Sequence, residues 1–133
     1  MKFDGETFEF YFDLAHYFMM MNELFSLTQI GETCQVGQID EALENVVMSQ
    51  EMQYKEIMSM IPPKQKQVLQ AIAREGRATG ITSAAFVRRY QLPSASSIQS
   101  AVKGLLEKEI ITVEDGSYRI YDYFMSYWLA RKY

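Results

Sequence analysis

The sequence is poor in cysteine and histidine, because its 133 residues contain only Cys34 and His16. A single cysteine excludes a disulfide framework within the chain and a zinc site built on several cysteines. A single histidine excludes histidine-rich metal sites and catalysis by several histidines. One enzymatic role stays open for these two residues: Cys34 could act as a nucleophile with His16 as its general base. His16 within an aromatic helix and Cys34 within a loop instead favour structural roles.

Long apolar runs are also missing. The most apolar stretch, residues 8–27, is interrupted by charged side chains such as Glu9 and Asp13, so it is too polar to span a bilayer. The N-terminus carries acids from Asp4 onward in place of the basic and apolar regions of a signal peptide. We therefore expect a cytoplasmic protein with no membrane partner.

The sequence contains no Gly-x-x-x-x-Gly-Lys-[Ser/Thr] phosphate loop. The glycines of residues 75–80 have no lysine at the required place and no strand before them, so this segment is more typical of a polar loop between helices. Asp40-Glu41 follows no strand-forming run and fits a helix start better than a Walker B strand. We therefore expect that this chain is not an enzyme and holds no cofactor or metal of its own.

The chain does have a globular composition and an uneven distribution of charge. Apolar residues make up 48% and charged residues 23%, which excludes a fully disordered or fibrous protein. The net charge of −4 is the sum of −9 over residues 1–60 and +5 over residues 61–133. The charge changes sign at Pro62-Pro63, where a helix must stop. The sequence therefore predicts a helical segment over 1–61 and a second domain over 62–133.

Two helices, over 8–28 and 39–60, are predicted for the first segment, with a loop at 31–37 between them. Apolar residues fall on nearly every face of the helix over 8–28, so that helix requires burial all round. A helix with no polar face would leave contact surface exposed in an isolated chain. We therefore expect a homo-oligomer formed through the N-terminal helices, with this helix exchanged between chains.

The second segment has the order of elements of a winged helix. Ser94 is predicted to cap the third of its helices, and Thr82 or Ser83 the short second one. Asp115-Gly116 between β-forming residues predicts a two-residue hairpin turn. The predicted elements are helices over 64–74, 82–90, 95–109 and 122–131, and strands over 110–114 and 117–121. The fold class expected is mainly α: a winged helix-turn-helix with a small β-hairpin wing, preceded by a two-helix segment.

In a winged helix the third helix usually enters the major groove of DNA, and the wing reaches the adjacent backbone. Serine and glutamine side chains can contact base edges or phosphates, and arginines can contact phosphates. However, acids at Glu107, Glu109 and the wing tip Glu114-Asp115 weaken the case for DNA. Docking on a protein therefore stays open. The candidate residues for binding nucleic acid or a partner are Arg88, Arg89, Ser96, Gln99, Ser100, Lys103 and Arg119.

Several segments resemble the C-terminal winged helix of archaeal-type P-loop ATPases, which are AAA+/STAND-like proteins. The resemblance begins at Ile61-Pro62-Pro63-Lys64-Gln65 and runs to Gly76. It continues through residues 86–99, 105–111 and 118–129, so it covers about 61–133. The first 60 residues are similar, more weakly, to the helical lid of that family, although Gly5-Glu6-Thr7 lacks the proline of its Gly-x-Pro turn.

The resemblance implies that this chain is a non-catalytic piece of a larger ATPase. It would bind DNA, a protein partner or its own ATPase core, and couple that binding to the core. ATP and Mg²⁺ would belong to the nucleotide-binding core of the parent, which this sequence does not contain. The alternative is a stand-alone winged-helix transcription regulator that binds DNA and uses its N-terminal helices as a dimerisation arm.

Overall fold

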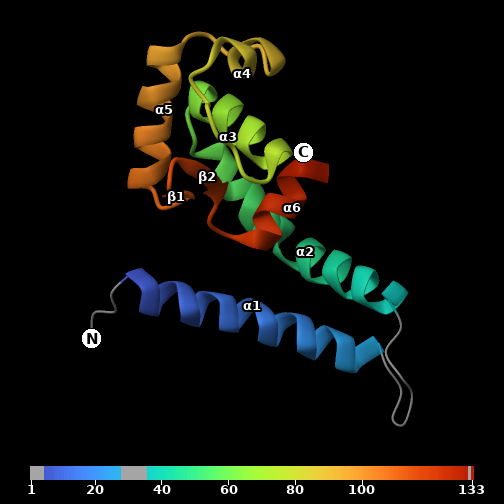
Figure 1. The fold of residues 1–133 in the computed structure, drawn as a ribbon. Helices are drawn as coiled ribbons and strands as arrows, with labels where there is room; N and C mark the ends of the chain where they lie inside the picture. Colours follow the sequence, from blue (N-terminus) through green and yellow to red (C-terminus); the bar gives the residue numbers. More distant parts are fainter. Residues whose placement is uncertain (1–4, 28–35, 132) are drawn as a thin grey trace. The chain divides into compact units, whose positions relative to one another are not determined.

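A computed structural model describes residues 5–27, 36–131 and 133 of the chain (Figure 1). The elements, in order, are α1 (Gly5–Leu27), α2 (Val36–Ser59), α3 (Pro63–Glu75), α4 (Ala84–Arg89), α5 (Ala95–Glu107), β1 (Ile111–Glu114), β2 (Ser117–Ile120) and α6 (Tyr123–Arg131). Two helices thus precede a helix, a short helix, a helix, a hairpin and a closing helix, which confirms the predicted fold class. None of the described helices is both long and apolar enough to cross a membrane.

The chain divides into two compact units, Met1–Gln50 and Glu51–Tyr133, called here the N-terminal unit and the C-terminal unit. In the N-terminal unit, the Asn45 side-chain amide donates to Glu23 Oε1 at 2.9 Å, and Gln38 Nε2 donates to the Leu27 carbonyl at 3.1 Å. These bonds join α1 to the first part of α2. Residues 36 and 37, predicted as the end of a loop, are helical; Cys34 lies outside the described residues.

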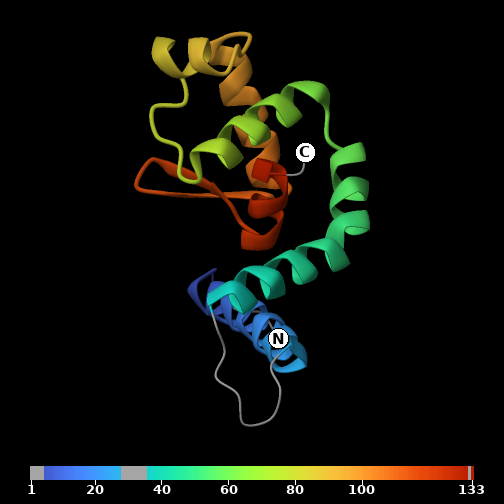
Figure 2. The ribbon, with the colours of Figure 1, turned by 90° about the vertical axis from the view of Figure 1, so that its right-hand side faces the viewer.

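The C-terminal unit is built around α3, which contacts α5, α6 and β2 (Figures 1 and 2). Proline at the first position of α3 is favourable, because that position donates no helical hydrogen bond. The helix ends at Glu75, and the following Gly76 caps it: its N–H donates to the Ile72 carbonyl at 3.0 Å, and its φ of 74° turns the chain out of the helix. The most completely buried side chains of this unit are Met58, Val68, Leu69, Ile72, Ile98, Leu105, Ile120 and Trp128.

The last turns of α2 belong to the C-terminal unit. Tyr54 is buried, and its ring centroid lies 5.5 Å from that of Trp128 in α6. The Trp128 indole N–H donates to Glu51 Oε1 at 3.3 Å. Burial, with a smaller contribution from the charge of Asp122, raises the pKa of Tyr54 above its ordinary value, so its hydroxyl stays protonated.

The wing is an antiparallel hairpin in which Thr112 pairs with Arg119. Asp115 and Gly116 have φ values of 50° and 75°, which is the positive-φ pair that a type I′ turn requires, so the predicted turn is confirmed. The predicted loop at 77–81 also contains a strand-like contact, because Ala78 and Tyr118 exchange two backbone hydrogen bonds of 2.8 Å. The loop therefore extends the sheet on the β2 side.

Most of the helix ends differ from the predicted ones by one to three residues. The α5 helix ends at Glu107 rather than 109, because Glu109 has a φ of 59° that a helix cannot continue. The α6 helix begins at Tyr123, since the Asp122 carboxylate accepts from the N–H groups of Phe124 at 2.9 Å and Met125 at 3.1 Å. Asp122 therefore acts as the N-cap and not as the first helical residue.

Candidate functional site

The helix-turn-helix is held by two serine caps. Ser83 Oγ accepts from the N–H of Phe86 at 3.2 Å, and Ser94 Oγ accepts from the N–H of Ser97 at 3.2 Å. Of the two caps proposed for α4, the structure selects Ser83. Between the helices, Leu92 is buried and its N–H donates to the Val87 carbonyl at 2.9 Å. The start of α5 is thus fixed by its cap and by an apolar anchor in the turn.

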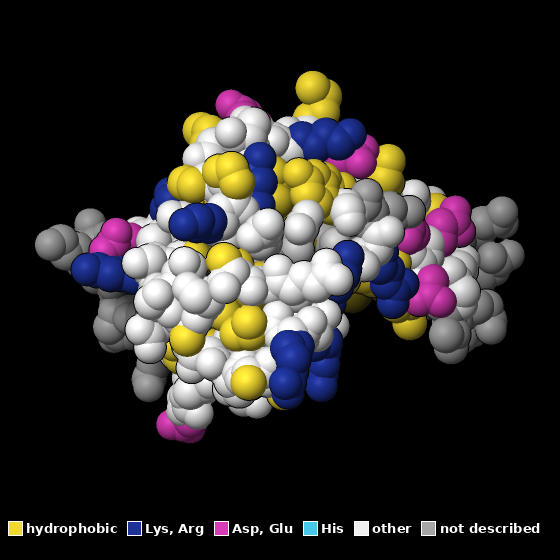
Figure 3. Space-filling view, turned by 90° about the horizontal axis from the view of Figure 1, so that it is seen from above, with side chains coloured by type: hydrophobic (Ala, Val, Ile, Leu, Met, Phe, Trp, Pro, Cys, Tyr) yellow, Lys and Arg dark blue, Asp and Glu magenta, His cyan; other side chains and the backbone are white. Residues whose placement is uncertain are grey.

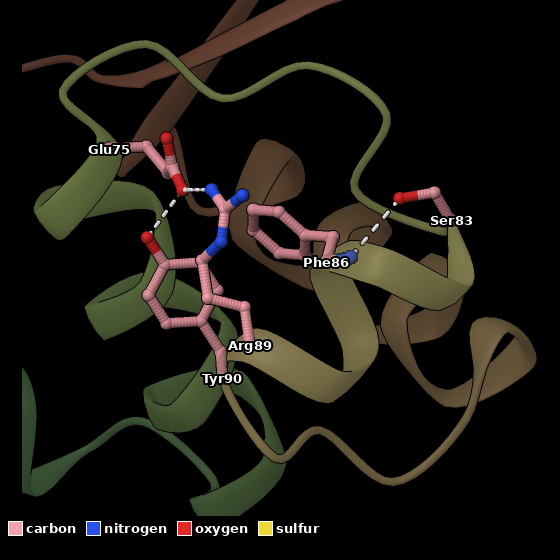
Figure 4. A network of polar contacts seen from close by, with 5 residues as sticks. All are labelled: Glu75, Ser83, Phe86, Arg89 and Tyr90. Atoms are coloured by element: carbon pink, nitrogen blue, oxygen red, sulfur yellow. Dashed lines mark hydrogen bonds and ion pairs between the residues drawn. The ribbon is translucent and has the colours of Figure 1, made fainter.

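The Arg89 side chain forms an ion pair within the C-terminal unit (Figure 4). Its Nη1 lies 2.8 Å from Glu75 Oε1 at the end of α3, and the Tyr90 hydroxyl donates to the same oxygen. The Tyr90 and Arg89 hydrogen bonds lower the pKa of Glu75 below its ordinary value. Desolvation and the Glu75 hydrogen bond raise the pKa of Tyr90. This cluster connects α4 to α3 through Arg89, whose side chain is nevertheless 63% exposed; Arg88 beside it is exposed as well.

Arg119 is also engaged within the fold. Its guanidinium lies 4.9 Å from the ring centroid of Tyr123, and its Nη1 donates to the carbonyls of Ile120 at 3.3 Å and Tyr121 at 3.4 Å. The side chain therefore joins the base of the wing to the start of α6. The tip of the wing, in contrast, presents the exposed acids Glu114 and Asp115.

The four remaining candidates lie on the exposed face of α5. Ser96, Gln99, Ser100 and Lys103 are exposed, whereas Ile98, Ala101, Val102 and Leu105 are buried on the other face. The Ser96 hydroxyl lies 3.2 Å from that of Ser94, the capping residue. The amphipathic spacing in the sequence therefore located this face correctly.

The candidates on α5 separate into two hollows of the surface. One, of about 390 Å³, lies between α5 and the start of α3 and includes Ser96 and Ser100. The sequence did not single out its other wall, Lys64 and Gln65, because nothing local indicates which helix α5 lies against. Gly104 leaves room for the Gln65 side chain against α5, since a Cβ there would lie 2.3 Å from Gln65 Nε2.

The second hollow, of about 540 Å³, is called here the wing groove. It lies between α5, the loop after α3 and the wing, and its lining residues are Gly80, Ile81, Thr82, Gln99, Val102, Lys103, Leu106, Glu107, Gly116 and Tyr118. Ile81 and Val102 are buried in its floor, and Lys103 and Glu107 carry opposite charges on its α5 wall. The groove is therefore apolar at its base and nearly neutral at its rim.

Cationic side chains do not gather in one patch on the face seen from above. In the view from above, the Lys and Arg side chains are separate groups among uncharged side chains (Figure 3). Within the part of the chain that the structure describes, no group of three or more His, Cys, Asp or Glu side chains is placed to hold a metal ion. The arrangement is suited to binding through α5 and its two hollows.

Comparison with known proteins gives one match. The family described as "Probable winged helix domain" matches residues 52–131, and neither curated proteins nor solved structures give a match. The matched residues are more than half of the chain and run from the end of α2 to the end of α6. The geometry agrees with this match, because α4 and α5 form a helix-turn-helix and β1–β2 form its wing. The chain therefore belongs to this family of winged-helix domains.

Proposed function

We propose that this chain is a non-catalytic winged-helix module that docks on protein through the wing groove. Winged helices bind DNA or protein, and the surface chemistry favours protein here. The observation that carries the proposal is the composition of the groove: buried Ile81 and Val102 in its floor and one lysine, Lys103, opposed by Glu107 on its wall. An apolar floor with few polar groups suits a side chain of a partner protein.

Electrostatics argue against DNA as the main ligand. A DNA-binding protein neutralises several phosphates, and those contacts supply most of its affinity. Two of the three candidate arginines, Arg89 and Arg119, already bind groups of the fold. The exposed acids Glu114 and Asp115 occupy the wing tip, where a phosphate backbone would pass. Lys103, Arg88 and Arg89 are the exposed candidate cations, and Arg89 is already paired with Glu75, which leaves few charges for an autonomous DNA-binding surface.

The module is proposed to belong to an ATPase of the archaeal AAA+/STAND-like type. The support is the resemblance of residues 61–76, 86–99, 105–111 and 118–129 to the C-terminal winged helix of those proteins. ATP and Mg²⁺ would bind the core of that parent, since this sequence has no phosphate loop. The role of this chain would be to relay the state of the core to a docked protein, or to dock on the core itself.

The test begins with the reading frame upstream of Met1. An in-frame phosphate loop is expected, and its absence would overturn the ATPase assignment. In the full-length ATPase, Leu106→Asp places a charge in the wing groove and is expected to change the ATP turnover rate. Met52→Asp, at an 86% exposed position in α2, is the matched control. Equal turnover in wild type and Leu106→Asp would contradict docking through the groove.

A second candidate function is a stand-alone regulator that binds DNA, with the N-terminal helices as a dimerisation arm. It is favoured by exposed Gln99, Ser100 and Lys103 on the helix that would enter the major groove. Fluorescence anisotropy with mixed-sequence duplexes at about 50 mM salt distinguishes the two functions. Saturable binding that weakens with salt, with a slope reduced by about one in Lys103→Gln, would support DNA. Protein docking predicts no saturable binding.

A further inference from the structure

The face of α1 that carries Tyr17, Phe18 and Phe25 is unusually apolar and open. These side chains are 58%, 56% and 71% exposed. With 100° between successive residues of a helix, they lie within one arc of α1 together with Met21, which occupies the position between Tyr17 and Phe25. This set of four side chains is called here the α1 face. The rings of Tyr17 and Phe18 lie edge to face, with centroids 5.9 Å apart.

We propose that the α1 face is a dimerisation surface that binds the α1 face of a second copy of this chain. The contact is symmetric, so each residue of the patch meets the same patch on the partner. This inference does not depend on what the winged helix binds.

Charge supports a second copy as the occupant. Residues 1–60 carry a net charge of −9, so two copies of this segment repel each other wherever their acids meet. Between residues 16 and 27 the sequence has a single carboxylate, Glu23. Its Oε1 accepts a hydrogen bond from Asn45 at 2.9 Å, and on the helix it lies opposite the α1 face. The four side chains of the α1 face are uncharged, so no carboxylate among them opposes the same face of a second copy.

The exposed area is also of the right order for a dimer. Phe and Tyr side chains each bury about 150–250 Å², so the exposed fractions of the three rings correspond to about 300–450 Å² per copy. A standard interface buries about 800 Å² per partner. The rings therefore supply about half of a standard contact before Met21, Asn22 and Ser26 are added. The result is a concentration-dependent dimer rather than a permanent one.

The α1 face also has the composition of an interface. Tyr, Phe and Met are enriched where proteins meet, and aromatic side chains often contribute most of the binding energy. Asn22 and Ser26 are exposed next to it and provide a polar rim. The symmetry axis is expected to pass near Met21, the central residue of the patch, which fixes the geometry that cross-linking can test.

The experiment is sedimentation velocity on the 133-residue chain between about 5 and about 200 µM, where mass action shifts a weak dimer. The mean mass is expected to rise from the 15.5 kDa of the monomer toward twice that value. Phe25→Glu is expected to raise the dimer dissociation constant at least about tenfold. Met52→Glu, which adds the same charge at an exposed methionine of α2, is expected to leave it unchanged.

A cross-linking measurement provides a gain of signal. In a Cys34→Ser background, Met21→Cys is expected to form a disulfide-linked dimer under mild oxidation, because the axis brings the two copies of this position together. Ser49→Cys in α2, also exposed, is the control and should stay monomeric. A wild-type chain that stays monomeric at the highest concentration would overturn the proposal. Equal changes in the dimer dissociation constant for Phe25→Glu and Met52→Glu would also overturn it. Equal cross-linking of Met21→Cys and Ser49→Cys would do the same.

Discussion

The two units of this chain use apolar side chains in opposite ways. The C-terminal unit buries Trp128, Leu69 and Leu105 almost completely, and its exposed face on α5 is mostly polar. In the N-terminal unit, buried side chains among residues 16–27 and 37–50 are confined to Ala42, Val46 and Val47. The rings whose burial is described there, Tyr17, Phe18 and Phe25, are exposed instead. The difference indicates that the C-terminal unit is stabilised by its own core, whereas the N-terminal unit presents surface suited to a partner.

The largest expected effect is the removal of the tryptophan ring from the C-terminal core. Trp128→Ala is expected to lower the free energy of unfolding by about 3–5 kcal/mol, because a cavity replaces a buried ring. Phe25→Ala is expected to change it by less than about 0.5 kcal/mol, since that ring is exposed in the monomer. Urea unfolding followed by circular dichroism checks both variants, as Trp128 is the single fluorescent tryptophan.

That comparison is made at about 2 µM protein, so that self-association contributes little to stability. Similar losses for the two variants would mean that α1 belongs to the same cooperative core. The C-terminal unit would then not be the only one stabilised by a core, and the contrast between the two units would be wrong.

A smaller effect comes from making the same substitution in each unit. Gly116→Ala is expected to destabilise the chain by about 1–2 kcal/mol, because its φ of 75° is unfavourable for a residue with a Cβ. Gly37→Ala lies near the start of α2, where a Cβ meets nothing within 4 Å. It is expected to stabilise by about 0.4–1 kcal/mol through the entropy of the unfolded chain.

Thermal unfolding of both glycine variants shows whether Gly116→Ala lowers the melting temperature and Gly37→Ala raises it. Destabilisation by Gly37→Ala would show that the helical start of α2 is not populated in solution. A neutral Gly116→Ala would show that the wing does not contribute to the stability of the C-terminal unit.

The smallest expected effect concerns the Glu75 cluster and pH. Because the pKa of Glu75 is lowered in the folded state, its contribution to stability is present above the ordinary carboxyl pKa. That contribution is lost as the pH falls through the lowered value. Wild type is therefore expected to be more stable than Glu75→Gln at neutral pH, with the difference vanishing in acid.

Urea midpoints measured across the acidic range test this expectation. Tyr90→Phe removes one of the two donors to Glu75 and keeps Arg89, so it should show an intermediate dependence on pH. A constant difference between wild type and Glu75→Gln at all pH values would argue against an ionised Glu75 in the fold.

Local sequence patterns predicted most of the fold. The Ser94 cap, the turn at Asp115-Gly116 and the buried face of α5 depend on residues close together in the chain, and each was found from the sequence. For α4 the sequence narrowed the cap to Thr82 or Ser83, and the structure selected Ser83. The bridge between Ala78 and Tyr118 was missed, because it joins residues forty positions apart and has no local pattern. Helix ends were displaced where a single positive φ or a capping carboxylate decided them.

The binding site was less predictable for the same reason. Charge and spacing could nominate Arg89 and Arg119, but their partners, Glu75 and Tyr123, were not identifiable as contacts before folding. Gln65 and Tyr118, which line the two hollows beside α5, carry no local signal of that role.

By itself the sequence determined the class of the fold, the winged-helix order of elements and the change of charge at Pro62-Pro63. Periodicity, capping and turn chemistry act over a few residues, so they can be read along the chain. Tertiary structure alone decided which arginines are free to bind, how the face of α5 divides between two hollows, and which rings of α1 are exposed. Each of these depends on contacts between distant residues, whose geometry is set only when the helices pack.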